Sequence, residues 1–380
     1  MQNGSLGTTC PASTRRRNIL PVAFLLLLAL LLTGCSEKAP AQAAASVAAT
    51  AATAPAITPS ATPTPVPTPV PTPTPEPTPP PTEDVTFIPP NPDIRPVAVM
   101  IDNQGDRPLP QAGIRQAQIV YEILTEYRIT RYLAFFWEGM PEMVGPVRSS
   151  RHYFLDWAME YDAVYVHYGY SPQAMKDIPR LKIQNINGLV HGEAFWDTDP
   201  DAGNWQDSFT SATRVAAQIE TRGLRTEPAK RFPFTYHDRF TVPAGGMPAT
   251  QIALTYGKGF TAGYAYDDKT GLYARTRNGA AQMERNTALQ VTPRNLVIQV
   301  VSSAPIPGDK ESRIDMKTVG KGIGWLATAG KTWEITWEKT ARDAQTIYRL
   351  ADGSEMILNP GQTWIQVIPS AKTVEMTSEP

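Results

Sequence analysis

One stretch of strand-forming residues, from position 118 to 151, constrains the fold of this chain most strongly. Its sequence is QIVYEILTEYRITRYLAFFWEGMPEMVGPVRSSR, and its apolar residues are mostly aromatic or β-branched, which favours buried strands. The same stretch carries two carboxylates, Glu122 and Glu126, and three guanidinium groups, those of Arg131, Arg148 and Arg151. An unpaired ionised group in a dry core is costly. We therefore expect these side chains to pair with one another or to line a cleft that a polar ligand enters.

The N-terminal residues predict export. Three arginines precede an apolar run from position 19 to 32, which ends in Leu-Thr-Gly-Cys at Cys35. The run is shorter than the roughly 20 residues that a membrane-spanning helix needs, and its charged start and small-residue end are typical of a signal peptide. The ending resembles the lipobox of bacterial lipoproteins, in which the cysteine becomes the first mature residue and carries diacylglycerol. The resemblance implies that residues 1–34 are removed and that Cys35 anchors the protein to the outer face of the cytoplasmic membrane.

The composition that follows agrees with this location. The chain has two cysteines, and with Cys10 removed and Cys35 lipidated the mature protein would hold no thiol for a disulfide or a thiolate site. Residues 35–83 are mostly Ala, Thr and Pro, which bury too little apolar surface to fold, so we expect a disordered tether whose Pro-rich end is extended. A Pro-rich ligand for an aromatic groove and an O-glycosylated segment are the competing interpretations of that end.

The remaining chain predicts two globular parts of the α+β or α/β class. Residues 84–242 combine strand and helix patterns and are expected to form an α/β domain around a mixed sheet. Residues 243–372 show short strands separated by explicit turns, which predicts a smaller, mostly β domain. Residues 373–380 are expected to be a tail. The second domain shows no evident functional cluster, so we interpret it as a support or binding module.

Residues 96–103 predict a buried strand that places Asp102 and Asn103 at its carboxyl end. Ligands bind at that end in open α/β sheets. The alternative, equally supported, is that both side chains cap the turn that follows. Two further strands, at 119–126 and 131–137, are joined by a short connection, which predicts antiparallel neighbours.

Strand geometry limits what the two glutamates can do together. With a side-chain period of two, Glu122 and Glu126 would share one face but lie about 13 Å apart at about 3.3 Å per residue. The paired carboxylates of glycosidases are separated by roughly 5 to 9.5 Å. A two-carboxylate mechanism would therefore recruit a residue from elsewhere, such as Asp102, whereas a mechanism with one acid would not.

The segment 145–151, with sequence GPVRSSR, predicts a helix start capped by Ser149 or by the serine after it. Free backbone amides beside Arg148 and Arg151 would make an anion site. The alternative is that these arginines neutralise the glutamates. His167 ends another predicted strand, and the four histidines of the chain lack ligand spacing, so we expect neither a metal site nor a cofactor.

Several ordered motifs carry a family resemblance, namely VAVMIDN, IVYEILTEYRITRYLAFF, GPVRSSRHYFLDWA, YVHYGYSP and LNPGQTWIQVIP. With these, residues from about 90 to 369 resemble the YerB-like bacterial lipoproteins, a domain of unknown function with a C-terminal companion domain. The resemblance implies a tethered, two-part extracytoplasmic protein. In one hairpin where the family pattern leads us to expect a His-x-Asp pair, this chain has AQME at 281–284, so no role of that pair is carried over.

Two functional hypotheses follow, and both exclude nucleic acid as a partner because the chain is exported and its net charge is −1. In the first, the protein cleaves cell-wall glycan, with Glu126 or Glu122 as general acid near Asp102 and the arginines on substrate carboxylates or phosphates. In the second, it is a non-catalytic envelope protein that recognises a glycan or a protein partner. The first predicts a cleft-facing carboxylate with a raised pKa, and the second predicts closed ion pairs. We favour a site directed at peptidoglycan.

Overall fold

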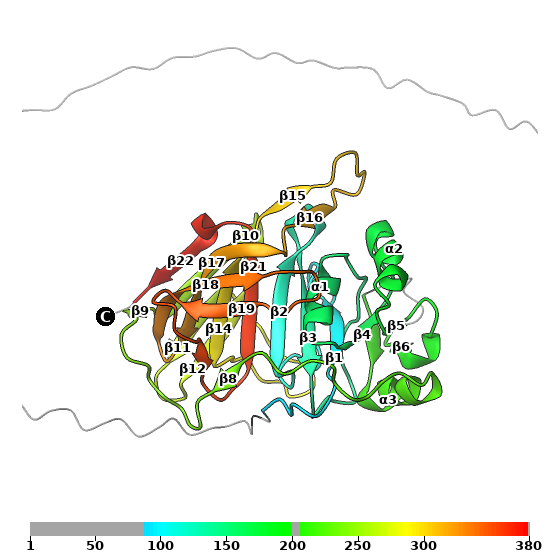
Figure 1. The fold of residues 1–380 in the computed structure, drawn as a ribbon, viewed down its shortest axis with the longest axis horizontal. Helices are drawn as coiled ribbons and strands as arrows, with labels where there is room; N and C mark the ends of the chain where they lie inside the picture. Colours follow the sequence, from blue (N-terminus) through cyan, green and yellow to red (C-terminus); the bar gives the residue numbers. More distant parts are fainter. Residues whose placement is uncertain (1–86, 88, 200–205, 379–380) are drawn as a thin grey trace, which may run out of the picture. The chain divides into compact units, whose positions relative to one another are not determined.

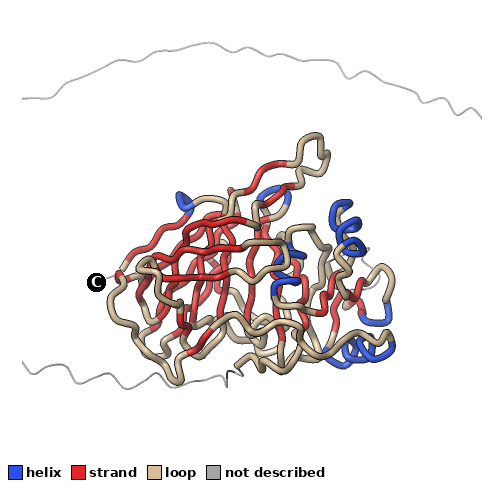
Figure 2. Tube along the Cα trace, viewed as in Figure 1, coloured by secondary structure: helices blue, strands red, loops and turns tan. Residues whose placement is uncertain are grey.

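A mixed sheet of eleven strands forms the centre of the computed structural model, which describes residues 87, 89–199 and 206–378 (Figures 1 and 2). The ten strands on its main path are, in spatial order, β19 (Ile347–Leu350), β18 (Lys331–Lys339), β17 (Gly320–Thr328), β14 (Asn295–Val300), β21 (Thr363–Ile368), β2 (Ile119–Leu124), β3 (Thr130–Phe136), β1 (Val97–Asp102), β4 (Val164–His167) and β5 (Asn185–Asn187). The eleventh, β9 (Met247–Pro248), pairs with β18. The predicted α+β class with a mixed sheet is confirmed.

Strand β21 joins the two parts of the chain that the sequence distinguishes. It lies between β14 and β2 and runs parallel to both, so hydrogen bonding continues across the sheet from the second part into the first. All six of its residues are buried, as expected for a strand inside a sheet covered on both faces. The two parts therefore share one sheet.

Six strands of this sheet point the same way. β14, β21 and β2 are parallel, β3 is antiparallel to both β2 and β1, and β1, β4 and β5 are again parallel. The carboxyl ends of β14, β21, β2, β1, β4 and β5 consequently meet at one edge, which we call the carboxyl edge. The predicted antiparallel pairing of β2 with β3 is confirmed.

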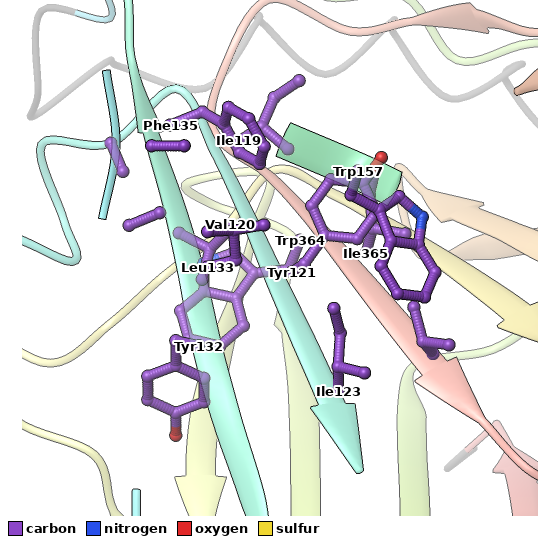
Figure 3. Packing of buried hydrophobic residues seen from close by; sticks show 14 of the residues in the cluster. Ile119, Val120, Tyr121, Ile123, Tyr132, Leu133, Phe135, Trp157, Trp364 and Ile365 are labelled. Carbon is purple, nitrogen blue, oxygen red and sulfur yellow. The ribbon is translucent and has the colours of Figure 1, made fainter. Parts of the chain in front are cut away.

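The sheet is covered on both faces. On one face, a second sheet packs through Arg275, whose guanidinium lies 4.5 Å from the ring of Trp364. On the other, the first helix packs through Trp157, 5.7 Å from the ring of Tyr121, within the hydrophobic cluster of Figure 3. The second sheet comprises β13 (Ala280–Ala281), β12 (Leu272–Arg277), β11 (Phe260–Asp267), β10 (Gln251–Gly257) and β22 (Val374–Thr377). Its last strand occupies residues that the sequence analysis placed in a tail.

Three α-helices lie among the described residues: α1 (Phe154–Glu160), α2 (Pro172–Arg180) and α3 (Ala212–Thr221). The last two begin at serine caps. The hydroxyl of Ser171 accepts a hydrogen bond from the amide of Ala174 at 3.2 Å, and Ser211 accepts from Arg214 at 3.1 Å.

Short elements complete the described chain: the 3-10 turns η1 (Glu126–Arg128), η2 (Gly192–Ala194) and η3 (Ala371–Thr373), and the paired strands β6 (Phe195–Asp197) with β7 (Ser208–Thr210), β8 (Thr235–Tyr236) with β20 (Ile357–Leu358), and β15 (Ser303–Pro305) with β16 (Ile314–Met316). The β15–β16 hairpin projects from the sheets in Figure 1. No helix among the described residues is long and apolar enough to span a membrane. The predicted signal peptide, the lipidation site Cys35 and the predicted tether lie outside the described residues.

Candidate functional site

The carboxyl edge collects most of the residues that the sequence singled out. Strand β1 ends at Asp102 and is followed by Asn103, β4 ends at His167, and β2 is followed by Glu126. The antiparallel β3 starts at this edge and carries Arg131 in its second position. Sheet topology therefore places residues up to 65 positions apart in the sequence along one edge.

The segment 146–151 reaches the same edge by lying between two strands. Beyond their first three residue pairs β1 and β4 separate. There the amide of Arg148 donates to the carbonyl of Met100 at 2.9 Å, while the amide of Tyr168 donates to the carbonyl of Arg148 at 3.0 Å. The segment thus continues the sheet in place of β4, and it carries Arg148 and Arg151 to the edge.

The predicted helix start at Ser149 or Ser150 is wrong. The helix begins at Phe154, after Tyr153, whose side chain makes no capping hydrogen bond. The amide of Ser150 instead donates to the carbonyl of Gly169 at 3.0 Å, which removes it from the predicted anion site. Ser149 contributes its carbonyl oxygen, which accepts a hydrogen bond from Arg131 at 2.8 Å.

The carboxylate of Glu126 is bound by two arginines. Its Oε2 accepts from Nε of Arg151 at 2.8 Å, its Oε1 accepts from Nη2 of the same arginine, and Oε1 also accepts from Arg131 at 3.1 Å. Burial alone would raise the pKa of this carboxyl, but the hydrogen bond from Arg151 and the two positive charges lower it to about 2. Glu126 is therefore ionised at neutral pH and is not poised to donate a proton.

Asp102 forms the second acidic position of the edge and is fully buried. Its Oδ2 lies 3.2 Å from Nε of Arg148 and accepts a hydrogen bond from the amide of Gln206 at 2.8 Å. Its Oδ1 accepts from the backbone of Gln104 at 3.0 Å, as the turn-capping interpretation predicted. Asp102 therefore caps the turn, as one interpretation predicted, and pairs with Arg148; its role towards a ligand stays a prediction.

Among the described residues, three guanidinium groups and two carboxylates thus form one cluster, in which positive charges outnumber negative ones by one. Burial, followed by the nearby charge of Arg151, lowers the pKa of Arg131 to about 10. Burial likewise lowers the pKa of Arg148. Its side chain is 14% exposed, against 1% for Arg131, so Arg148 is the guanidinium of this pair that solvent or a ligand reaches more easily.

Glu122 does not belong to this cluster, because it lies on the opposite face of the sheet. The expectation that the two glutamates share a face is wrong: β2 ends at Leu124, and the chain enters the η1 turn before reaching Glu126. Glu122 instead accepts from Thr130 at 2.8 Å and pairs with Arg275 of the second sheet at 2.5 Å. The counter-charge of Glu122 therefore comes from a residue 153 positions away in the chain.

Asn103 also faces the second sheet. Its side chain donates to Thr130 at 2.7 Å, and its Oδ1 accepts from Nε of Arg277 at 2.8 Å. The second part of the chain therefore supplies two buried arginines, Arg275 and Arg277, that sequence reasoning did not assign to any site. The sequence did hold a sign of these arginines. Residues of β12 alternate between partly buried and buried, and both arginines occupy buried positions.

The hairpin that carries Gln282 instead of the expected histidine also contributes to this contact. Gln282 is 3% exposed, and its amide donates to Gln111 at 3.0 Å and to the hydroxyl of Tyr132 at 3.1 Å. Glu284, two residues on, accepts from the backbone of Gly113 at 2.7 Å. Both side chains join the second part of the chain to the first.

His167 is buried at the carboxyl edge, where its ring stacks on Tyr165 with 4.9 Å between centroids. Nδ1 lies 2.7 Å from the carbonyl of Gly169 and Nε2 lies 3.1 Å from Oδ1 of Asn185. Burial lowers its pKa to about 4, against which the two hydrogen bonds act. His167 is therefore neutral at pH 7 and adds no charge to the cluster. No three His, Cys, Asp or Glu side chains group as metal ligands within the described residues.

Known protein families match this chain in two separate regions, one in each of its two parts. The chain is 33% identical over 279 residues to "Putative lipoprotein YerB" of Bacillus subtilis strain 168, a match that covers 72% of this chain and 81% of that protein. The chain belongs to the YerB-like family. Residues 88–225 match "Protein of unknown function (DUF3048) N-terminal domain", and residues 252–365 match "Protein of unknown function (DUF3048) C-terminal domain".

The crystal structure of the YerB protein from Bacillus subtilis has the same architecture. The two structures superpose with a TM-score of 0.67 at 30% identity, over 75% of this chain and 94% of that one. Both YerB-like regions contribute to the charged sites described above: the cluster around Glu126 lies within the N-terminal match, whereas Glu122 is paired across to the C-terminal match.

Proposed function

We propose that this chain is a lipid-anchored protein of the cell envelope that binds peptidoglycan at the carboxyl edge without cleaving it. The relative named as a lipoprotein supports the anchor, together with the predicted signal peptide and Cys35. The observation that carries the proposal is the net-positive, ion-paired cluster at the carboxyl edge. An anionic group of the wall would complete its charge balance, as carboxylates commonly do beside arginine.

The ion pairs of Glu122, Glu126 and Asp102 argue against cleavage by these acids, which the sequence suggested. A general acid in a glycosidase needs a pKa raised toward the working pH. Glu126 has instead a pKa of about 2, and Glu122 and Asp102 are buried against Arg275 and Arg148. These are the closed ion pairs that the non-catalytic hypothesis predicts.

The proposal is tested by sedimenting the protein with purified sacculi and analysing the supernatant for released fragments. We expect wild type to bind and to release no fragments. Arg148→Gln should weaken binding at least tenfold, because it removes the more accessible cation of the cluster. Arg349→Gln is the matched control, since it removes an exposed arginine from β19, at the far end of the sheet.

Two results would contradict the proposal. Equal binding by wild type and Arg148→Gln would exclude the carboxyl edge as the binding site. Fragments released by wild type but not by Glu126→Gln would show that the protein cleaves the wall with Glu126 in the reaction.

A further inference from the structure

The connection between β2 and β3 has an unfavourable backbone conformation. Tyr127 has a φ angle of 56° and Arg128 one of 60°, so two consecutive non-glycine residues occupy the left-handed region. Side chains are disfavoured there, and such residues persist only where the surroundings hold them. The turn is closed by the amide of Thr125, which donates to the carbonyl of Ile129 at 2.7 Å.

Both flanks of the turn are clamped. On one side, Glu126 is fixed by its ion pairs with Arg131 and Arg151. On the other, the stem of Arg128 lies against Gly257, where an added Cβ would come within 2.6 Å of the Cβ of Arg128. The ion-paired cluster therefore helps to hold this strained turn in its conformation at the carboxyl edge.

The turn displays an aromatic ring to solvent. Tyr127 is 60% exposed and is the only Phe, Trp or Tyr among the described residues whose side chain is largely exposed. Its hydroxyl has one polar neighbour, Glu311 of the projecting β15–β16 hairpin, at 3.5 Å. A ring that buries so little area and occupies a disfavoured backbone position contributes little to folding, so its presence calls for another role.

We infer that Tyr127 is a binding platform on which a sugar ring of peptidoglycan stacks, while the adjacent cationic cluster takes a carboxylate of the same glycan. The apolar face of a pyranose packs on an aromatic face, and a tyrosine adds a hydroxyl that bonds to a sugar hydroxyl. Tyr127 directly follows Glu126, whose carboxylate pairs with Arg131 and Arg151, so the backbone that carries the ring is anchored by the cationic cluster. This inference rests on the proposed function and adds the sugar ring as the second recognised group.

The test compares binding and stability in the full chain, kept in detergent, with sacculi freed of phosphate polymers as the probe. Tyr127→Gly should weaken binding at least tenfold and at the same time raise Tm by roughly 2 to 4 °C, since glycine adopts the left-handed conformation without strain. Tyr127→Phe keeps the ring and should bind within about threefold of wild type. Ala329→Gly is the control and should leave binding unchanged. Ala329 also has a left-handed φ, of 50°, but it directly follows β17, at the end of that strand away from the carboxyl edge.

The outcomes separate this inference from the proposed function. If wild type fails to bind the sacculi, both are overturned. If Arg148→Gln loses binding but Tyr127→Gly binds as well as wild type, the proposed function stands and the platform is overturned. If Tyr127→Gly loses binding together with a lower Tm, Tyr127 is a structural residue and the platform is likewise overturned.

Discussion

Replacing Glu126 by glutamine should destabilise the protein by several kcal/mol at neutral pH. The substitution keeps the size of the side chain but removes the negative charge that faces Arg131 and Arg151, both of which are buried. Breaking a buried ion pair by removing one partner costs about 3 to 5 kcal/mol, because the remaining charge stays uncompensated.

The pKa of Glu126 gives a second, independent value for the stability that its ion pairs contribute. It lies at about 2 in the folded protein, against an ordinary value of 4.5. At about 1.4 kcal/mol per pKa unit, this difference corresponds to about 3 kcal/mol of stability. Because the folded-state pKa is the lower one, the stability is fully present above pH 4.5 and is lost as the pH falls toward 2.

Urea unfolding of wild type and Glu126→Gln at a series of pH values between 7 and 2 measures this contribution. The difference in free energy of unfolding between the two proteins should be largest at pH 7 and should shrink by about 3 kcal/mol on acidification. Other carboxylates contribute to acid unfolding equally in both proteins, so the difference isolates Glu126. A difference under 1 kcal/mol at pH 7, or one that does not change with pH, would refute the ion-pair description of this site.

Three further substitutions test the ion pairing, strand packing and helix capping of the fold, each by urea unfolding. Arg275→Met should cost about 3 to 5 kcal/mol because it leaves Glu122 buried without its counter-charge, and a cost near zero would contradict this pairing. Gly324→Ala should destabilise by more than about 1 kcal/mol, since its new methyl group would collide with the backbone of Ile298 on the neighbouring strand, and an unchanged midpoint would show that the strands can separate. Ser171→Ala should cost about 1 kcal/mol through loss of the α2 cap, whereas an effect above about 3 kcal/mol would indicate a second role for this serine.

Local patterns determined much of the secondary structure. The predicted strands 96–103, 119–126 and 131–137 match β1, β2 and β3 to within two residues at each end, because a continuous run of β-branched and aromatic residues is a short-range signal. The serine cap of α2 is a similarly local feature, because a hydroxyl and a backbone amide three residues apart meet without help from the rest of the fold. The failed cap at Ser149 or Ser150 shows the limit, because the amide of Ser150 binds the carbonyl of Gly169 in another segment and the helix starts only at Phe154.

The sequence alone also established that charged residues inside a strand-forming stretch need partners, since burial without compensation is too costly. It did not determine the partners. Glu126 meets Arg151 because β2 ends at Leu124 and Glu126 begins a turn instead of continuing the strand. Glu122 meets Arg275 because the second sheet, which contains β12, packs on that face of the central sheet. Both outcomes depend on turn conformation, strand order and register between distant segments. Those are properties of the tertiary structure, and spacing along the chain does not encode them.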